Sequence, residues 1–220
     1  MTRIVPHSWP SVPAEAIALQ KELRNLVVTR DDLARVNTVA GLDVGPPSSA
    51  GMIRGAIAAL SFPDLRMADQ AVAYRIPALA YVPGLLSFRE VPALLAALEK
   101  LCLQPDLLLC DGQGLAHPRR FGLACHVGVL TDIPSIGVAK SLLVGEHAPV
   151  PAKRGAWRPL LHKGELVGAA LRTRTGRAPV YVSIGHRVSL ETAIHYTLAC
   201  TPRFRLPETT RAAHRLASGP

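Results

Sequence analysis

The sequence predicts a mixed α/β domain in which a three-stranded antiparallel meander leads into parallel strands that alternate with helices. Strand-like segments joined by short Pro- and Gly-containing breaks come first, and short apolar runs then alternate with amphipathic segments. With 220 residues, 49% of them apolar, the chain is long enough to build one substantial core. We therefore expect residues 1–220 to form a single domain.

The first part of the chain is predicted to be a helix followed by the meander. Pro13 suits the first turn of a helix, and apolar residues recur at helical spacing after it, which predicts a helix over residues 13–29. The breaks GPPSSAG and FPDLR are typical of hairpin turns. They separate predicted strands at residues 37–44, 51–61 and 67–76.

The second part is predicted to alternate between helices and strands. The run DLLLCD is short and almost entirely apolar, which suits a strand buried on both faces. Predicted helices cover residues 91–103, 121–130, 190–200 and 207–217, and predicted strands cover 106–111, 133–138, 165–172 and 179–184. Residues 140–165 are predicted to be an inserted loop with a short strand around Trp157. This order is that of a ribonuclease-H-like mixed sheet flanked by helices.

Charge and cysteine usage bound the partners and the compartment. The formal net charge is +9, and nucleic acid is the commonest partner of so basic a protein, although a basic surface also serves solubility alone. Cys102 and Cys110 lie in or beside apolar runs, which predicts buried free thiols and a reducing, cytoplasmic setting. We expect no membrane contact, because no apolar run reaches membrane-spanning length, and a monomer is the simplest state.

Two acids follow strand-like segments. Asp43 lies near the end of the first predicted strand, and Asp111 ends the run DLLLCD. If these strands are parallel neighbours, both carboxylates meet at the edge where open α/β sheets bind ligands. Paired carboxylates repel each other, and a hard divalent cation such as Mg²⁺ relieves that repulsion and can activate water for attack on a phosphodiester. The alternative is that each acid is a cap or turn residue, and Asp-Gly is ordinary turn chemistry.

Glu90, Lys140 and His214 are further candidates, each with a structural alternative. Glu90 is a third metal ligand, or an acid that only favours the start of the predicted helix at residue 91. Lys140 follows a predicted buried strand, where it contacts phosphate or is merely solvated. His214 lies on the last predicted helix and reaches the site only if that helix folds back over the sheet.

The segment DGQGLAHPRRFG is the most unusual part of the sequence. Gly112 and Gly114 permit close approach of a ligand to the backbone and leave amides to donate hydrogen bonds. His117, Arg119 and Arg120 supply donors and positive charge suited to phosphates. A basic surface loop explains the arginines equally well, but explains the glycines less well.

A stiff turn, Tyr81-Val82-Pro83-Gly84, precedes Glu90. It is a core tyrosine before an ordinary Pro-Gly turn, or a wedge that enters a duplex and unstacks its bases.

Taken together, these motifs resemble the endonuclease V (deoxyinosine 3′ endonuclease) family. The likeness runs from VAGLDV to the last helix, and its most specific parts are YVPGLLSFRE, PDLLLCDGQGLAHPRRFGLACHVGV and IPSIGVAKSLLVG. The chain departs from the family at VGPPSSAG, where a longer strand is more usual, and at Ala80, where proline is common.

The resemblance implies a nuclease that uses Mg²⁺, with Mn²⁺ as a substitute, and incises DNA at the second phosphodiester bond 3′ to deoxyinosine. It implies a catalytic set of Asp43, Glu90, Asp111, Lys140 and His214, of which the three acids bind the metal. It also implies a wedge of Tyr81, Val82 and Pro83, a base-holding set of Gly84, Leu86, Gly112 and Gly114, and a phosphate contact at His117. Rival interpretations are a junction resolvase, an inosine-specific ribonuclease and a non-catalytic nucleic-acid-binding module.

Overall fold

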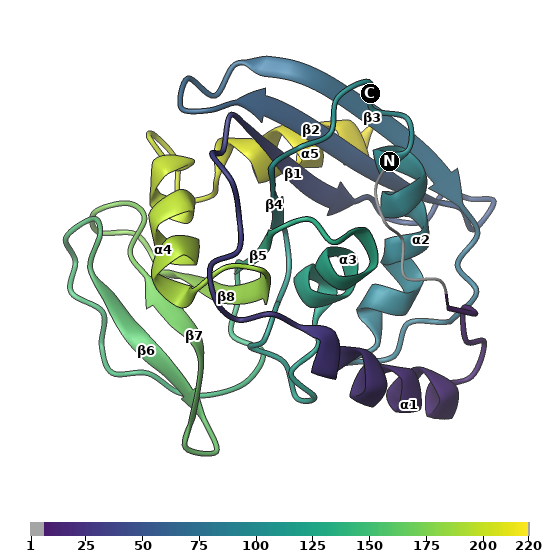
Figure 1. Ribbon diagram of the computed structural model, residues 1–220, viewed down its shortest axis with the longest axis horizontal. Coiled ribbons are helices and arrows are strands. Elements are labelled where there is room, and N and C mark those ends of the chain that lie inside the picture. The colour runs from purple at the N-terminus through teal and green to yellow at the C-terminus, as the bar shows by residue number, and fades with distance from the viewer. Residues whose placement is uncertain (1–6, 220) are drawn as a thin grey trace.

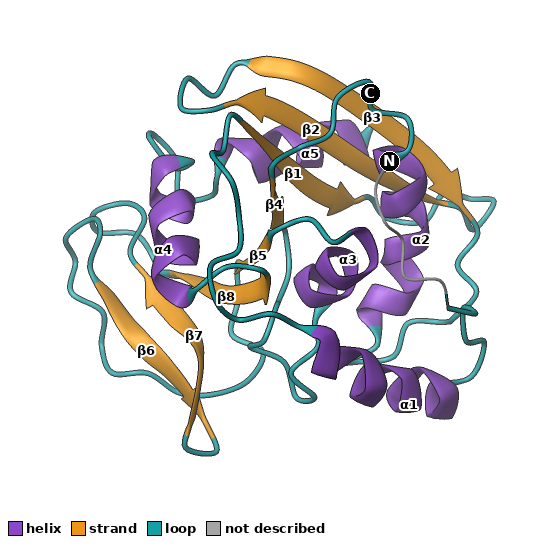
Figure 2. Ribbon diagram, viewed as in Figure 1, coloured by secondary structure: helices purple, strands orange, loops and turns teal. Residues whose placement is uncertain are grey.

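A single eight-stranded sheet organises the computed structural model, which describes residues 7–219 (Figure 1). The strand order is β3-β2-β1-β4-β5-β8-β7-β6. The meander predicted from the sequence is confirmed: β1, β2 and β3 pair antiparallel in succession. Strands β1, β4 and β5 are parallel neighbours, as the alternation of strands and helices predicted. The architecture is the ribonuclease-H-like mixed sheet that the sequence predicted, with helices on both faces (Figure 2).

The strands are β1 (Thr38–Val44), β2 (Ile53–Ser61), β3 (Met67–Arg75), β4 (Leu107–Cys110), β5 (Ser135–Ala139), β6 (Trp157–His162), β7 (Glu165–Leu171) and β8 (Val180–His186). The α-helices are α1 (Pro13–Leu23), α2 (Leu86–Leu98), α3 (Leu123–Thr131), α4 (Leu190–Ala199) and α5 (Glu208–Ser218). A 3₁₀ turn at residues 24–26 follows α1. None of these described helices is long and apolar enough to cross a membrane.

Alternation along the central strands decides which helices cover which face. Successive side chains of a strand point to opposite faces, so Leu108 and Cys110 of β4 face one way and Leu107 and Leu109 the other. The first pair packs with α2 and α3, and the second pair packs with α4. Helix α5 covers the same face as α4, against β1 and β2. The sheet is therefore the middle of three layers, and α1 lies outside the α2–α3 layer.

Helix α1 is shorter than predicted. The sequence predicted a helix to residue 29, but the chain becomes extended after Leu26. The Val28 amide donates to Nδ1 of His186, and the Val28 carbonyl accepts from the Arg187 amide. These tertiary hydrogen bonds replace the bonds that would have continued the helix.

Helix α2 begins earlier and ends earlier than predicted. Pro92, the second residue of the helix predicted over residues 91–103, is typical of a first helical turn, but it lies inside α2. The true start follows the turn at Gly84, whose φ of 78° is a left-handed value that suits glycine. Glu90 is consequently the fifth residue of the helix and not an acid preceding it. This corrects the helix-start interpretation of Glu90.

Two other expectations need smaller corrections. The short strand expected around Trp157 is confirmed as β6, which pairs with β7, but it extends to His162, so the irregular segment covers only residues 140–156. The hairpin of β7 and β8 is confirmed. Cys102 is exposed and not buried, whereas Cys110, Cys125 and Cys200 are buried free thiols.

A close contact at Gly41 fixes α5 on the sheet. A Cβ atom at this position would overlap the backbone carbonyl of Thr209, at the start of α5. Because that neighbour is backbone, no rotation of a side chain relieves the overlap. The lack of a side chain at residue 41 therefore lets α5 approach β1, and α5 carries His214.

We expect Gly41→Ala to lower the free energy of unfolding by about 3 kcal/mol, because α5 must shift away from β1. The matched control is Gly112→Ala, whose Cβ would meet only the Leu123 side chain, at 3.2 Å. That control should lose less than about 1 kcal/mol. Urea unfolding of both variants measures the difference, and equal losses would contradict this account of Gly41.

Candidate active site

Three acidic residues from distant parts of the chain converge at one edge of the sheet. Asp43 lies near the end of β1 and Asp111 directly follows β4. These strands are parallel neighbours, and the Asp111 amide donates to the Leu42 carbonyl at 3.1 Å. Glu90 reaches the same place from α2 and interacts electrostatically with both aspartates. The condition that the sequence left open, that the two strands are neighbours, is met.

Crowding and burial change the acidity of this cluster. Burial raises the pKa of Glu90 to about 8, and repulsion from Asp43 and Asp111 adds to the rise. Burial and the charge of Asp111 also raise the pKa of Asp43, although a hydrogen bond from His214 opposes the rise. The site therefore disfavours the accumulation of negative charge, which is the condition that a bound cation relieves.

Two positively ionisable side chains already contact the acids. Nζ of Lys140 lies 2.5 Å from Oδ2 of Asp111, and Lys140 directly follows β5. Nδ1 of His214 lies 2.6 Å from Oδ2 of Asp43. Helix α5 does fold back over the sheet, so His214 meets the condition that its candidacy required. All five residues of the predicted catalytic set thus lie at one edge.

The donor set fits a hard divalent cation in its chemistry, since carboxylate oxygens are the ligands that Mg²⁺ and Mn²⁺ prefer. Within residues 7–219, however, no three His, Cys, Asp or Glu side chains already surround a common point as metal ligands. Asp111 and Asp43 are instead engaged by Lys140 and His214. A cation would therefore compete with these internal contacts for the same oxygens.

A hollow of about 290 Å³ is lined by Asp111, one of the three acids, and we call it the Tyr81 hollow. Its lining joins the wedge-like turn to the loop after β4 and to the segment after β5. Tyr81 lies at this hollow with 65% of its surface exposed, so it is not a core tyrosine. The predicted residues that line the hollow are Tyr81, Gly84, Leu86, Asp111, Gly112, His117 and Lys140. Val82, Pro83 and Gly114 are not among its lining residues.

Leu142 and Leu143 also line the Tyr81 hollow, and sequence reasoning missed them. Both are exposed. The signal was present in the sequence, because two consecutive leucines interrupt a segment otherwise rich in Gly, Pro and basic residues. Large exposed apolar side chains around a hollow are typical of a surface that binds something.

A set of hydrogen bonds holds the wedge-like turn in place. The Gly84 carbonyl accepts from Nε2 of Gln20 at 3.0 Å, from Nε2 of His117 at 3.1 Å and from a guanidinium nitrogen of Arg119 at 2.6 Å. Nε of Arg119 also donates to Oε1 of Gln20. Gln20, on α1, was missed at the sequence level, because a glutamine on a helix carries no signal of its distant partner. It ties three separate segments together.

The structure corrects the expected charges of the loop after β4. His117 is buried, and burial together with Arg119 lowers its pKa to about 4. Its Nδ1 accepts from the Arg119 amide, so the ring is neutral. Arg120 pairs with Glu165 on β7. The phosphate-binding charge expected of His117 is therefore absent at neutral pH.

The glycines of this loop also serve a different purpose from the one predicted. The Gly112 amide donates to the Cys110 carbonyl, and the Gly114 amide donates to Oγ of Ser183. Neither amide is free for a ligand. A Cβ at Gly114 would overlap the Ile184 carbonyl, so this glycine permits close packing of the loop on β8.

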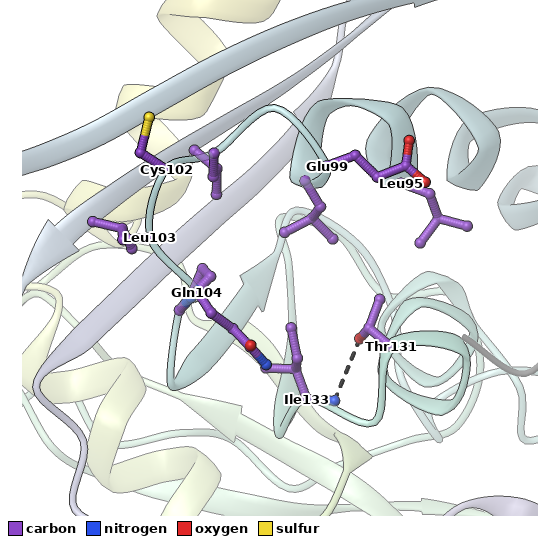
Figure 3. Close-up of a pocket in the computed structure, with 10 residues that line it drawn as sticks. Leu95, Glu99, Cys102, Leu103, Gln104, Thr131 and Ile133 are labelled. Atoms are coloured by element: carbon purple, nitrogen blue, oxygen red, sulfur yellow. Dashed lines mark hydrogen bonds between the residues drawn. The ribbon is translucent and has the colours of Figure 1, made fainter. Parts of the chain in front are cut away.

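Another pocket lies at the opposite end of β4, between α2 and α3 (Figure 3). It is lined mainly by apolar residues, together with the exposed residues Glu99 and Cys102, and Pro105 precedes β4 there. Because the candidate carboxylates follow the other ends of β1 and β4, this pocket is separate from the site.

The fold and the carboxylate cluster define a ribonuclease-H-like nuclease. A family model described as Endonuclease V matches residues 21–215. The chain belongs to the endonuclease V family.

Relatives and solved structures extend this likeness over nearly the whole chain. Endonuclease V of Trichormus variabilis is 56% identical over 97% of both chains. The crystal structure of endonuclease V from Streptomyces avermitilis is 45% identical, with a TM-score of 0.92 over 99% of this chain and 96% of that one. That of Ciona intestinalis endonuclease V, in complex with a DNA containing an inosine, is 29% identical, with a TM-score of 0.81 over 93% and 95% of the two chains.

We expect His117→Gln to reduce the acid sensitivity of the fold. The unfolded histidine binds a proton near its ordinary pKa of 6.5, whereas the folded one resists until about 4. Wild-type stability should therefore fall across this window, by up to about 3 kcal/mol relative to the variant, which does not titrate there. Urea unfolding between neutral pH and about pH 4.5 measures this difference. Parallel losses in both proteins would show that His117 is not buried as a neutral ring.

Proposed function

We propose that this protein is a metal-dependent endodeoxyribonuclease that incises DNA at the second phosphodiester bond 3′ to deoxyinosine and leaves 5′-phosphate ends. The observation that carries the proposal is the convergence of Asp43, Glu90 and Asp111 beside the Tyr81 hollow. The DNA bound to the Ciona intestinalis relative, which contains an inosine, supports the choice of substrate. Mg²⁺ is the proposed metal, with Mn²⁺ as its substitute, and the protein acts as a cytoplasmic monomer.

The three acids would hold the metal, which when bound supplies charge stabilisation and a more acidic water. Lys140 and His214 would act on the phosphate and on water, respectively. Lys140 would release Asp111 and contact the phosphate as a point charge. His214 donates to Asp43 through Nδ1, so in the neutral ring Nε2 is left as a proton acceptor for a water molecule.

Gln113 offers a means of distinguishing inosine from adenine. Its Nε2 donates to the Ser141 carbonyl, which fixes the orientation of the amide. Its Oε1 is buried without a hydrogen-bond partner among the described residues, and Gln113 lines the Tyr81 hollow. A buried acceptor without a partner is costly, and a donor on the ligand would relieve that cost. Hypoxanthine carries a ring N–H at N1, where adenine has a lone pair.

The wedge would act before the chemistry. Tyr81 is exposed at the tip of a turn that Pro83 stiffens and the Gly84 carbonyl anchors. Such a side chain can insert between bases while the altered base enters the Tyr81 hollow. A mismatched inosine pair lowers the cost of that extrusion.

A nicking assay on end-labelled strands tests the proposal. Purified protein with Mg²⁺ should cut an inosine-containing DNA duplex at one position, EDTA should stop the reaction, and added Mg²⁺ or Mn²⁺ should restore it. The matching adenine duplex should remain intact. Equal cutting of the adenine and inosine duplexes would refute base recognition by the Tyr81 hollow. Preference for a branched junction would favour a resolvase, and preference for inosine in RNA would favour a ribonuclease.

Substitution at Glu90 tests the carboxylate site. We expect Glu90→Gln to slow incision at least about a hundredfold, since even partners that only orient metal ligands cost tenfold to a hundredfold when removed. Glu99→Gln, at an exposed position just beyond the end of the same helix, is the matched control and should keep wild-type activity. Single-turnover rates at saturating Mg²⁺ measure both variants. Full activity of Glu90→Gln would show that this residue is not a metal ligand. If the wild-type protein itself binds DNA without cutting it, the protein is a binding module and not a nuclease.

A further inference from the structure

Three neighbouring hollows lie between the Tyr81 turn and the exposed ring of Phe204. A second hollow, against α5, shares Asp111 and Lys140 with the Tyr81 hollow. Arg215 lines this α5 hollow and also lines a third hollow beside Phe204, the Phe204 hollow. Because neighbouring hollows share lining residues, they lie next to one another on the surface.

Phe204 is an exposed aromatic ring held in a fixed position. It lies in the connection between α4 and α5, and 40% of its surface is exposed. The guanidinium carbon of Arg211 lies 3.4 Å from the ring centroid, so it covers one face of the ring. Arg211 is itself held by Glu208, at 2.8 Å. The ring is thus fixed without being buried, which lowers the entropy cost of stacking on it.

Unpaired positive charge surrounds this ring. Arg203 and Arg215 line the Phe204 hollow, are exposed, and form no ion pair with any residue between 7 and 219. Of the two acids that also line it, Glu208 is paired with Arg211, which leaves Asp64 as the opposing charge. An aromatic ring among arginines is the pattern that binds single-stranded nucleic acid, because bases stack on the ring and the arginines contact phosphates.

We propose that Phe204 is a stacking platform for a base of the cut strand on the 3′ side of the incised bond, with Arg203 and Arg215 contacting the adjoining phosphates. The assignment of this base to the 3′ side of the incised bond rests on the proposed function. The Tyr81 hollow would hold the altered base and the carboxylates would hold the bond to be cut. A strand that continues across the adjacent hollow against α5 would then reach Phe204. Because every base has a stacking face, the platform should show little sequence preference.

Two inosine-containing DNA strands test the platform. The short strand ends one nucleotide beyond the proposed incision bond, and the long strand continues for several more. Fluorescence anisotropy in EDTA measures binding without cleavage. We expect Phe204→Ala to weaken binding of the long strand about fivefold or more and to leave the short strand unchanged, while Phe204→Trp retains wild-type affinity.

Trp157→Ala is the matched control. Trp157 is also aromatic, is 39% exposed, and lies on β6 at the far edge of the sheet from β1. It should bind both strands as the wild type does. A second variant, Arg203→Gln with Arg215→Gln, keeps the ring and should weaken the dependence of long-strand binding on salt.

Several results would overturn the platform: equal wild-type affinity for the two strands, an equal loss for both strands in Phe204→Ala, or the same loss in Trp157→Ala. Thermal melting of Phe204→Ala separates lost binding from lost fold, and a folded variant with unchanged affinity for the long strand also ends the proposal. Incision by the wild type in Mg²⁺ is scored separately. If the wild-type protein binds the long strand more tightly through Phe204 but does not cut it, the platform proposal stands and the proposed function is refuted.

Discussion

Mutual repulsion among three carboxylates is the constraint on which the active-site region depends. Asp43, Glu90 and Asp111 would separate in a flexible chain, but the parallel pairing of β1 with β4 holds the first and third together. Helix α2 brings Glu90 against them, and burial together with their repulsion raises the pKa of Glu90 to about 8. Lys140 and His214 offset part of this repulsion. The fold therefore holds carboxylates that repel one another at one edge of the sheet, and a divalent cation would relieve this repulsion.

Close backbone contacts position the elements around this edge. The contact at Gly41 lets α5 carry His214 to Asp43. The Gly84 carbonyl gathers donors from α1 and from the loop after β4, which holds the Tyr81 turn over its hollow. Neither contact takes part in the chemistry, but each determines where a functional side chain lies. Helix α5 also positions the platform proposed at Phe204, because its Arg211 covers one face of the Phe204 ring.

The outcomes of the sequence predictions follow a physical pattern. Residues at the ends of strands, such as Asp43 and Asp111, lie where the pattern placed them, because strand periodicity and neighbour pairing leave little freedom. The boundaries of α2 were predicted wrongly because a proline is typical of a first helical turn, whereas tertiary packing places Pro92 inside the helix. His117 was given a charge that its burial removes. The amides of Gly112 and Gly114 were expected to face a ligand, but they close internal hydrogen bonds.

The sequence by itself determined the order of strands and helices, the family resemblance and the identity of the acids, since these depend on periodicity and on motifs read in order along the chain. Tertiary structure decided that Glu90 projects from within a helix, that His117 is neutral, that Gln20 anchors the Gly84 turn, and that Phe204 lines a hollow next to the one lined by Asp111. These properties depend on burial and on contacts between residues far apart in the chain. Such contacts leave no periodic signal in one sequence, because the local sequence around each residue does not identify its distant partner.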